Sequence, residues 1–179
     1  MWRPHARLTT LARMSRLHLS PLGFSAQEIT AVVELYASNP EYCRAAGEYD
    51  PDDVQHEQVA SDLRAEVTTD GCEVLLARDQ ENSVIGLISL LHQHPGDGHP
   101  WIAMLIVHGA MQRRGLGRRL ADLAEDRFRA AGRDNLRLCV FESMPSSLAF
   151  WTTLGWQEVR RGATNEHGRP VIVLQKMLT

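Results

Sequence analysis

The sequence is poor in cysteine, and its three cysteines form no paired motif. Cys43, Cys72 and Cys139 are odd in number, and no two of them are spaced as Cys-x-x-Cys. Isolated cysteines of this kind favour neither a disulfide framework nor a thiolate zinc site. We therefore expect a protein of a reducing compartment, the cytoplasm.

Long apolar runs and an excess of basic charge are also missing. The longest apolar stretches, 84–91 and 101–107, are far shorter than the roughly 20 residues of a membrane-spanning helix. Lys and Arg number 19 against 22 Asp and Glu, a net charge of −3, so no overall positive field is available to hold nucleic acid. We expect neither a membrane nor a nucleic-acid partner. A chain of 179 residues with 44% hydrophobic and 23% charged residues is typical of one globular domain.

Acidic residues are absent from the first part of the chain. The first is Glu28, and Arg3, Arg7, Arg13 and Arg16 precede it. This composition resembles that of a mitochondrial transit peptide, which is one interpretation. The simpler one is a basic N-terminal extension over residues 1–14, followed by a domain over 15–179.

Helix signals precede the strands that dominate the middle of the chain. Ser25 and Glu28 have the spacing of a capping box, which predicts a helix up to about Ala37 that Pro40 ends. Asp50-Pro51 predicts the start of a second helix. Its apolar stripe consists of Val54, Val59, Leu63 and Val67.

Apolar and alternating segments predict most of a sheet. Strands are expected at Leu17–Leu19, Glu73–Arg78, Ser83–Leu91, Trp101–Val107, Leu136–Phe141, Trp156–Arg161 and Val171–Met177, and further helices at Leu116–Ala131 and Pro145–Leu154. The run 101–107 is apolar on both faces, which favours a central strand covered on both sides. The strand, helix and strand between 101 and 141 imply parallel pairing in a mixed sheet.

The loop Gln112-Arg-Arg-Gly-Leu-Gly117 lies between that apolar strand and an amphipathic helix. Gly115 and Gly117 let backbone N–H groups approach a ligand closely, and the start of a helix favours negative charge. Positive charge is added by Arg113, Arg114, Arg118 and Arg119. The loop lacks the Lys-Ser/Thr of a P-loop, and Leu120 stands where a dinucleotide fingerprint needs Gly or Ala. The pattern therefore predicts a pyrophosphate cradle of another kind.

With these residues the sequence resembles the GNAT superfamily of acyl-CoA-dependent N-acetyltransferases. Gln112, Gly115 and Gly117 match the motif of that family's pyrophosphate loop, and residues 148–156, Leu-Ala-Phe-Trp-Thr-Thr-Leu-Gly-Trp, resemble its final motif. The likeness extends from 16 to 177. It implies a single α/β domain with a mixed, twisted sheet of six or seven strands flanked by helices. It also implies a splay between strands 101–107 and 136–141 that admits the pantetheine arm of acetyl-CoA.

The resemblance assigns residues to the acyl donor, and no metal is expected. The expected contacts with acetyl-CoA are Ile106, Val107, Gln112, Arg113, Arg114, Gly115, Leu116, Gly117, Arg118, Ser147 and Trp151. Two positions depart from the family. Met144 replaces an Asn that reaches the cofactor arm, and Trp151 replaces a Tyr that protonates the leaving thiolate. An indole N–H is not a usable acid, so either another group or solvent supplies that proton or the catalytic step is slow.

Acetyl transfer to an amine needs a base and an oxyanion donor. Glu142 and His108 are the candidate bases, and the Val107 amide, beside an expected bulge, is the candidate donor. Tyr36, Tyr42 and Tyr49 are expected near the acceptor groove or packed between helices, and the loop 161–169 is expected to form another wall. Cys139 is expected to be a buried small residue and to carry no acyl group. The histidines His92, His94, His99 and His108 are interpreted as turn residues rather than metal ligands.

These inferences lead to one favoured function and several alternatives. The chain is expected to transfer the acetyl group of acetyl-CoA to a primary amine, most simply a small molecule, by direct attack in a ternary complex. A non-catalytic module that binds or senses acyl-CoA is the first alternative, and a protein N-terminal or lysine acetyltransferase is the second. A nucleotide-binding domain of another fold is the third. The resemblance also allows a homodimer.

Overall fold

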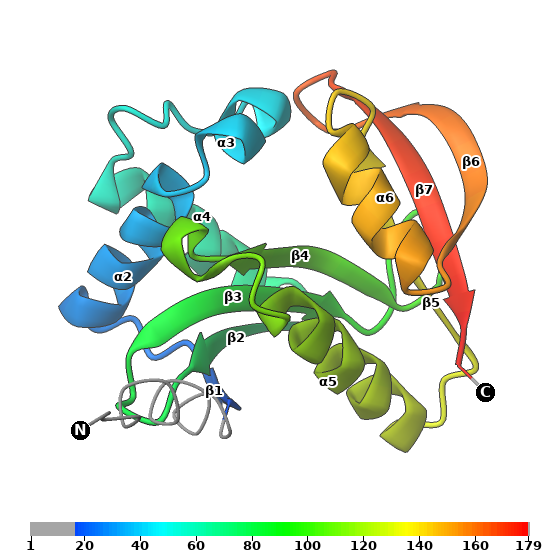
Figure 1. The fold of residues 1–179 in the computed structure, drawn as a ribbon, viewed down its shortest axis with the longest axis horizontal. Coiled ribbons are helices and arrows are strands. Elements are labelled where there is room, and N and C mark those ends of the chain that lie inside the picture. The colour runs from blue at the N-terminus through cyan, green and yellow to red at the C-terminus, as the bar shows by residue number, and fades with distance from the viewer. Residues whose placement is uncertain (1–16, 179) are drawn as a thin grey trace, which may run out of the picture.

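The computed structural model describes residues 17–178, which form one seven-stranded sheet with helices packed on it (Figure 1). The strands are β1 (His18–Pro21), β2 (Cys72–Arg78), β3 (Val84–Leu91), β4 (Trp101–Val107), β5 (Asn135–Phe141), β6 (Gln157–Thr164) and β7 (Pro170–Met177). The helices are α2 (Ala26–Ala37), α3 (Pro40–Ala46), α4 (His56–Thr68), α5 (Leu116–Ala130) and α6 (Pro145–Thr153), with a 3₁₀ turn, η1 (Gly109–Met111). The predicted extension over 1–14 lies outside the described residues.

The sheet has the order β1-β2-β3-β4-β5-β7-β6, and only β4 and β5 are paired in parallel. These two strands are joined by the crossover helix α5, as the sequence predicts. They pair at a single position, Trp101 with Arg137, and diverge beyond it. Figure 1 shows β4 and β5 leading into two diverging halves of the molecule. The predicted mixed sheet and its splay are therefore confirmed.

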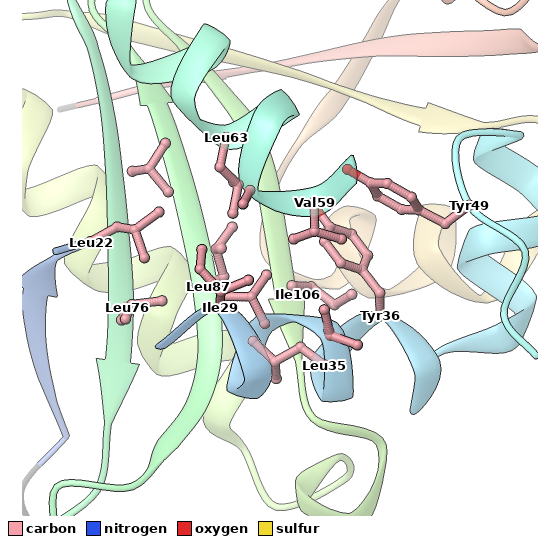
Figure 2. Packing of buried hydrophobic residues seen from close by; sticks show 14 of the residues in the cluster. Leu22, Ile29, Leu35, Tyr36, Tyr49, Val59, Leu63, Leu76, Leu87 and Ile106 are labelled. Carbon is pink, nitrogen blue, oxygen red and sulfur yellow. The ribbon is translucent and has the colours of Figure 1, made fainter. Parts of the chain in front are cut away.

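Two apolar clusters cover opposite faces of the sheet. In β2, Val74 and Leu76 belong to a cluster with α2 and α4, whereas Leu75 belongs to one with α5 and α6. Successive strand residues point to opposite faces, so these clusters lie on either side of the sheet. Figure 2 shows the first cluster, in which Leu35 and Leu87 are almost fully buried. Burial of these side chains fixes α2 and α4 against one face of the sheet.

The helical half of the chain differs from prediction at Pro40. The capping box is present, with the Glu28 amide donating to the Ser25 hydroxyl oxygen, and α2 ends at Ala37 as expected. Pro40, however, begins the short helix α3 instead of only ending α2, because proline fits the first helical turn as well as it breaks an interior. The second predicted helix starts at His56 and not at Asp50, since residues 50–53 form a turn closed by the Asp53 amide.

Three predictions about the central strands are wrong, two of them because the sheet is open between β4 and β5. Ala103 is exposed, so β4 is not covered along its whole length. The irregularity in β4 occurs between Ile102 and Met104, several residues before the expected position near Val107. Cys139 is exposed and not buried, because β5 has no neighbour along this part of its β4 side.

The three cysteines are free thiols. Among residues 17–178, none of the helices has the length and apolar character required to cross a bilayer.

Candidate functional site

Three neighbouring pockets run along the gap in the sheet. The loop pocket is lined by Leu105, Val107, Gln112, Arg113, Gly115, Gly117, Arg118, Ser146, Ser147, Phe150, Thr153 and Leu154. The strand-gap pocket is lined by Tyr42, Glu48, Ile102, Ala103, Met104, Leu105, Leu138, Cys139, Val140, Phe141, Met144, Ser147, Trp151 and Asn165. The acidic pocket is lined by Tyr36, Glu48, Tyr49, Gln58, Asp62, Leu63, Ala65, Glu66, Thr69, Ala103, Met104, Glu166 and His167.

Shared lining residues make these pockets direct neighbours. Leu105 and Ser147 line both the loop pocket and the strand-gap pocket. Glu48, Ala103 and Met104 line both the strand-gap pocket and the acidic pocket. The three pockets therefore follow one another from the loop, along the gap between β4 and β5, to Glu48.

The N-terminal end of α5 has the features of an anion-binding site. Its N-cap, Gly115, has the positive φ of 79° that glycine readily adopts, and no side chain caps the first turn. The first turn of α5 also lacks an acidic residue, in contrast to the Ser25 and Glu28 pair on α2. Because the first amides of a helix have no partner within it, they are left to a bound anion. Arg113 and Arg118 add positive charge to the same pocket.

The loop before α5 is fastened to the C-terminal end of α2. The Gly109 amide donates to Ser38 Oγ at 3.0 Å. Asn39 Nδ2 and Gln112 Nε2 both donate to the Val107 carbonyl oxygen at 3.1 Å, and Gln112 Nε2 also donates to Asn39 Oδ1 at 2.6 Å. The Gln112 side chain thus holds the loop in place, while the loop's backbone faces the pocket.

Backbone amides of β4 are available inside the gap. The His108 amide donates to the Ile85 carbonyl of the β3 side, so His108 belongs to the hydrogen-bonded class of antiparallel pairs. That alternation turns the amides of Val107 and Leu105 away from β3, toward the gap where β5 has diverged. These two N–H groups can bond a ligand that runs along β4.

Glu48 reaches the junction of the pockets through a glycine turn. α3 ends at Gly47, which has a φ of 78°. Gln58 Nε2 donates to the Glu48 carbonyl at 3.2 Å, and Asn165 Nδ2 of the β6–β7 turn donates to the Ala46 carbonyl at 3.1 Å. The turn between α3 and α4 is therefore held from both sides. Figure 1 shows α3 and the β6–β7 turn at the same end of the molecule.

The acidic pocket has a cavity volume of about 630 Å³, in the range of small-molecule sites. Its four carboxylates, Glu48, Asp62, Glu66 and Glu166, face one basic side chain, His167. The Tyr49 hydroxyl donates to Asp62 Oδ2 at 3.0 Å, and Figure 2 shows Tyr49 pointing toward α4. Excess negative charge around a cavity of this size fits a small cation.

Burial raises the pKa of Glu48 above its ordinary value, and nearby His167 offsets part of that rise. Burial also raises the pKa of Glu66, while a hydrogen bond from the Ser89 hydroxyl opposes it. A carboxylate with a raised pKa is a stronger base than an ordinary one. Of the two, only Glu48 also borders the strand-gap pocket.

The structure gathers most of the predicted donor contacts and separates the predicted bases from them. The gathered residues are Val107, Gln112, Arg113, Gly115, Gly117, Arg118, Ser147 and Trp151. Arg114 is exposed outside the three pockets, while Ile106 and Leu116 are buried in apolar clusters. Glu142 lies beside Arg161 at 3.9 Å, and His108 Nδ1 accepts from the Ala110 amide. Neither of these two lines the pockets, and both remain predictions.

Sequence reasoning missed Asn39, Glu48 and the Leu105 amide. The segment 36–53 carried a signal, since it has three tyrosines and five acidic residues, but only its tyrosines and the acids at 50–53 suggested a place near the acceptor. The expected wall at 161–169 does contribute, because Asn165, Glu166 and His167 line the pockets. The acidic turn over 50–53 lies outside them.

The histidines considered for metal binding do not converge. His92 bonds Glu73, His94 stacks on Trp101, and His99 bonds Asn135. Within residues 17–178, a different group comes close enough to share an ion, namely Glu48, Glu166 and His167, with candidate ligand atoms within 4.8 Å of one another.

Comparisons with known proteins identify the same architecture. The family model described as "Acetyltransferase (GNAT) family" matches residues 30–156. An acetyltransferase from Thermus thermophilus superposes with a TM-score of 0.74 at 21% identity, covering 93% of this chain and 99% of that one. The spermidine N-acetyltransferase from Vibrio cholerae, solved with CoA and spermine, gives 0.70 at 16% identity, covering 92% and 96%. No curated protein matches the sequence.

Proposed function

Because the chain belongs to the GNAT acetyltransferase family, we propose that it transfers the acetyl group of acetyl-CoA to a small cationic amine. The observation that carries this proposal is the row of three adjoining pockets, with Glu48 lining both the strand-gap pocket and the acidic pocket. The loop pocket would hold the pyrophosphate, the strand-gap pocket the pantetheine arm and thioester, and the acidic pocket the acceptor.

The loop pocket suits the pyrophosphate of acetyl-CoA. The uncapped start of α5, the side-chain-free Gly115 and the two arginines fit a diphosphate in charge and in space. A Cβ on Gly117 would lie 3.2 Å from the Phe150 ring, so the wall is already close-packed there. The Leu105 and Val107 amides would bond the carbonyls along the donor. Leu105 also lines the strand-gap pocket, so its amide is our proposed donor to the thioester oxygen.

Glu48 is the proposed general base. An amine is mostly protonated at neutral pH and must lose a proton before its lone pair can attack a thioester carbon. The Glu48 carboxylate, with its raised pKa, can accept that proton at the junction of the two pockets. Attack then occurs directly between the two bound substrates. Cys139 is proposed to carry no acyl group: it is exposed only within the strand-gap pocket, where desolvation raises the pKa of its thiol and so disfavours the reactive thiolate.

The acceptor is proposed to be a polyamine-like cation. The structural neighbour from Vibrio cholerae is described as a spermidine N-acetyltransferase, and the charge of the acidic pocket supports the same class here. An assay of CoA release over spermidine, amino sugars, alkylamines and lysine peptides tests this. Spermidine is expected to give the highest kcat/KM. A preference for lysine peptides would instead support a protein acetyltransferase.

Asp62→Asn is expected to raise KM for spermidine by roughly fivefold, because a partly exposed ion pair contributes on the order of 1 kcal/mol. KM for a simple alkylamine, which lacks the second ammonium group, should change little. The matched control is Asp53→Asn, an acid in the turn outside the pocket. An equal rise for both amines would show that Asp62 supports structure rather than recognising charge.

Arg118→Ala is expected to weaken CoA binding by about tenfold, through loss of a charge-assisted contact with the pyrophosphate. Isothermal calorimetry with CoA at low and high salt measures it, and the difference should shrink at high salt because exposed charges are screened. Arg114→Ala removes a neighbouring exposed arginine that lines none of the pockets and is the control. Equal losses in both variants would contradict the assignment of the loop pocket.

A further inference from the structure

Tyr42 is one of the residues that line the strand-gap pocket. The residue lies on α3, and its ring packs edge-on against Phe141 of β5 at 5.9 Å and near Tyr36 at 6.5 Å. Tyr49 donates its hydroxyl to Asp62, whereas no residue of 17–178 is hydrogen-bonded to the Tyr42 hydroxyl. Of the three tyrosines, Tyr42 alone lines the strand-gap pocket. It is thus an enclosed polar group that a ligand in this pocket can satisfy.

The other side chains around this pocket are poor hydrogen-bond donors to a sulfur that acquires negative charge. Trp151, on α6, is packed against Phe150 and Trp156, and Met144 offers no hydrogen. The Asn165 amide is already committed, since it donates to Ala46 and accepts from the amides of His167 and Arg169. Glu48 is the proposed base and adds negative charge. The remaining hydroxyl is that of Ser147, on the border of the loop pocket.

We propose that the Tyr42 hydroxyl donates a hydrogen bond to the sulfur of bound acyl-CoA and stabilises the thiolate that leaves. The inference rests on the proposed function. In the step, the bound ammonium first loses one proton to Glu48, which releases it to solvent. The amine lone pair then forms the C–N bond, Glu48 takes the second nitrogen proton, and the C–S bond breaks with its electron pair on sulfur. The thiolate takes a proton from solvent as CoA departs, and Glu48 returns its proton to solvent, so atoms and charge balance.

The electrostatic surroundings of Tyr42 fit a hydrogen-bond donor rather than an acid. Burial, and then the negative charge of Glu48, raise the pKa of Tyr42 well above its ordinary value. The O–H bond therefore remains intact throughout the working pH range. A phenol is also a stronger donor than the aliphatic hydroxyl of Ser147, which separates the two candidates in chemistry as well as in position.

The test measures the pKa of the CoA thiol in the binary complex. The ultraviolet absorbance of the thiolate reports its ionisation as pH is varied. The measurement uses a Cys139→Ala background, with the spectrum of the CoA-free protein subtracted, so that only the ligand thiol titrates. Tyr42→Phe should raise the pKa of the bound thiol by about one to two units, since it removes a hydrogen bond to a charged group. Tyr36→Phe, in the acidic pocket, should leave it unchanged.

Kinetics and an analogue separate this role from a structural one. Tyr42→Phe should lower kcat by about 10- to 100-fold while KM for acetyl-CoA changes much less. Binding of desulfo-CoA, which lacks the thiol, should be the same in Tyr42→Phe and in wild type. An unchanged thiol pKa in Tyr42→Phe, or a shift seen in Ser147→Ala instead, overturns the assignment. Wild-type protein that binds no CoA overturns the proposed function and this inference with it, whereas binding with an unshifted thiol overturns the inference alone.

Discussion

Glu48→Gln is expected to lower kcat by about 100-fold or more, the usual contribution of a positioned general base. The amide has nearly the same shape as the carboxylate but cannot accept the proton of the bound ammonium. CoA binding should persist, because Glu48 does not line the loop pocket. Steady-state kinetics with spermidine and calorimetry with CoA measure the two effects separately.

The pH dependence distinguishes loss of a base from loss of a structural contact. The rate of the wild type should fall as pH drops through the raised pKa of Glu48, because the protonated carboxyl no longer accepts a proton. This acidic fall in the pH–rate profile should be missing in Glu48→Gln. Any pH dependence that arises from ionisation of the acceptor's own amine should remain. Glu166→Gln alters an exposed carboxylate of the same pocket and should retain the acidic fall. Its loss in both variants would contradict the assignment of Glu48.

Glu48→Gln should lower activity without lowering the stability of the fold. The pKa of Glu48 is raised in the folded state above its ordinary value, so the folded protein binds this proton more tightly than the unfolded chain. The buried charge therefore costs stability at neutral pH, and the cost is relieved as pH falls through the raised value. Glu48→Gln should thus have an equal or higher Tm at neutral pH, and the advantage should shrink on acidification. A clear loss of Tm would indicate that Glu48 is a structural residue.

Gly109→Ala is expected to lower kcat/KM for acetyl-CoA by about 100-fold, as displacement of a positioning loop by about 1 Å does. A Cβ at this position would overlap the Ser38 carbonyl oxygen, a backbone atom that cannot rotate away. The loop must therefore move off α2 and lose the bond from the Gly109 amide to Ser38 Oγ. Overpacking of this kind costs about 1–3 kcal/mol, so the fold should survive. Steady-state kinetics and calorimetry with CoA measure the loss.

The control for this glycine is Gly132→Ala, beyond the far end of α5. Gly132 has a φ of 73° and open space around its Cβ position, so alanine there introduces backbone strain without a clash and away from the loop. It should lower Tm but leave CoA affinity unchanged. Asn39→Ala provides a milder version of the test, since it removes one of the two donors to the Val107 carbonyl. Wild-type affinity in both Gly109→Ala and Asn39→Ala would show that the contact with α2 does not position the loop.

The loop and the sheet could be predicted from sequence because their signals are local. Gly115 and Gly117 are adjacent to the helix that they begin, and the apolar periods of β4 and α5 are long enough to identify. The same reasoning failed for α3, which has only seven residues and whose first residue, Pro40, is equally typical of a helix end. Because α3 was not predicted, the sequence provided no position for Tyr42 and Glu48 relative to the sheet. The candidate bases were therefore chosen among residues that follow β4 and β5.

Contacts between distant segments account for the other omissions. Ser38 and Gly109 are 71 residues apart, and no sequence pattern links them. Their close contact is therefore visible only in the three-dimensional structure. Cys139 occupies an apolar strand in the sequence, and nothing in that pattern reveals that β4 diverges from β5 beside it. A gap in a sheet depends on the register of two strands, which hydrophobic alternation does not specify.

The most direct test of the proposed acetyl transfer is mass-spectrometric detection of product after purified protein is incubated with acetyl-CoA and spermidine. We expect monoacetylated spermidine in an amount equal to the released CoA, with both reduced by about 100-fold or more in Glu48→Gln. Binding of CoA without acetylated amine, across spermidine and the other acceptors, would contradict the transferase proposal and identify a module that only binds the acyl donor.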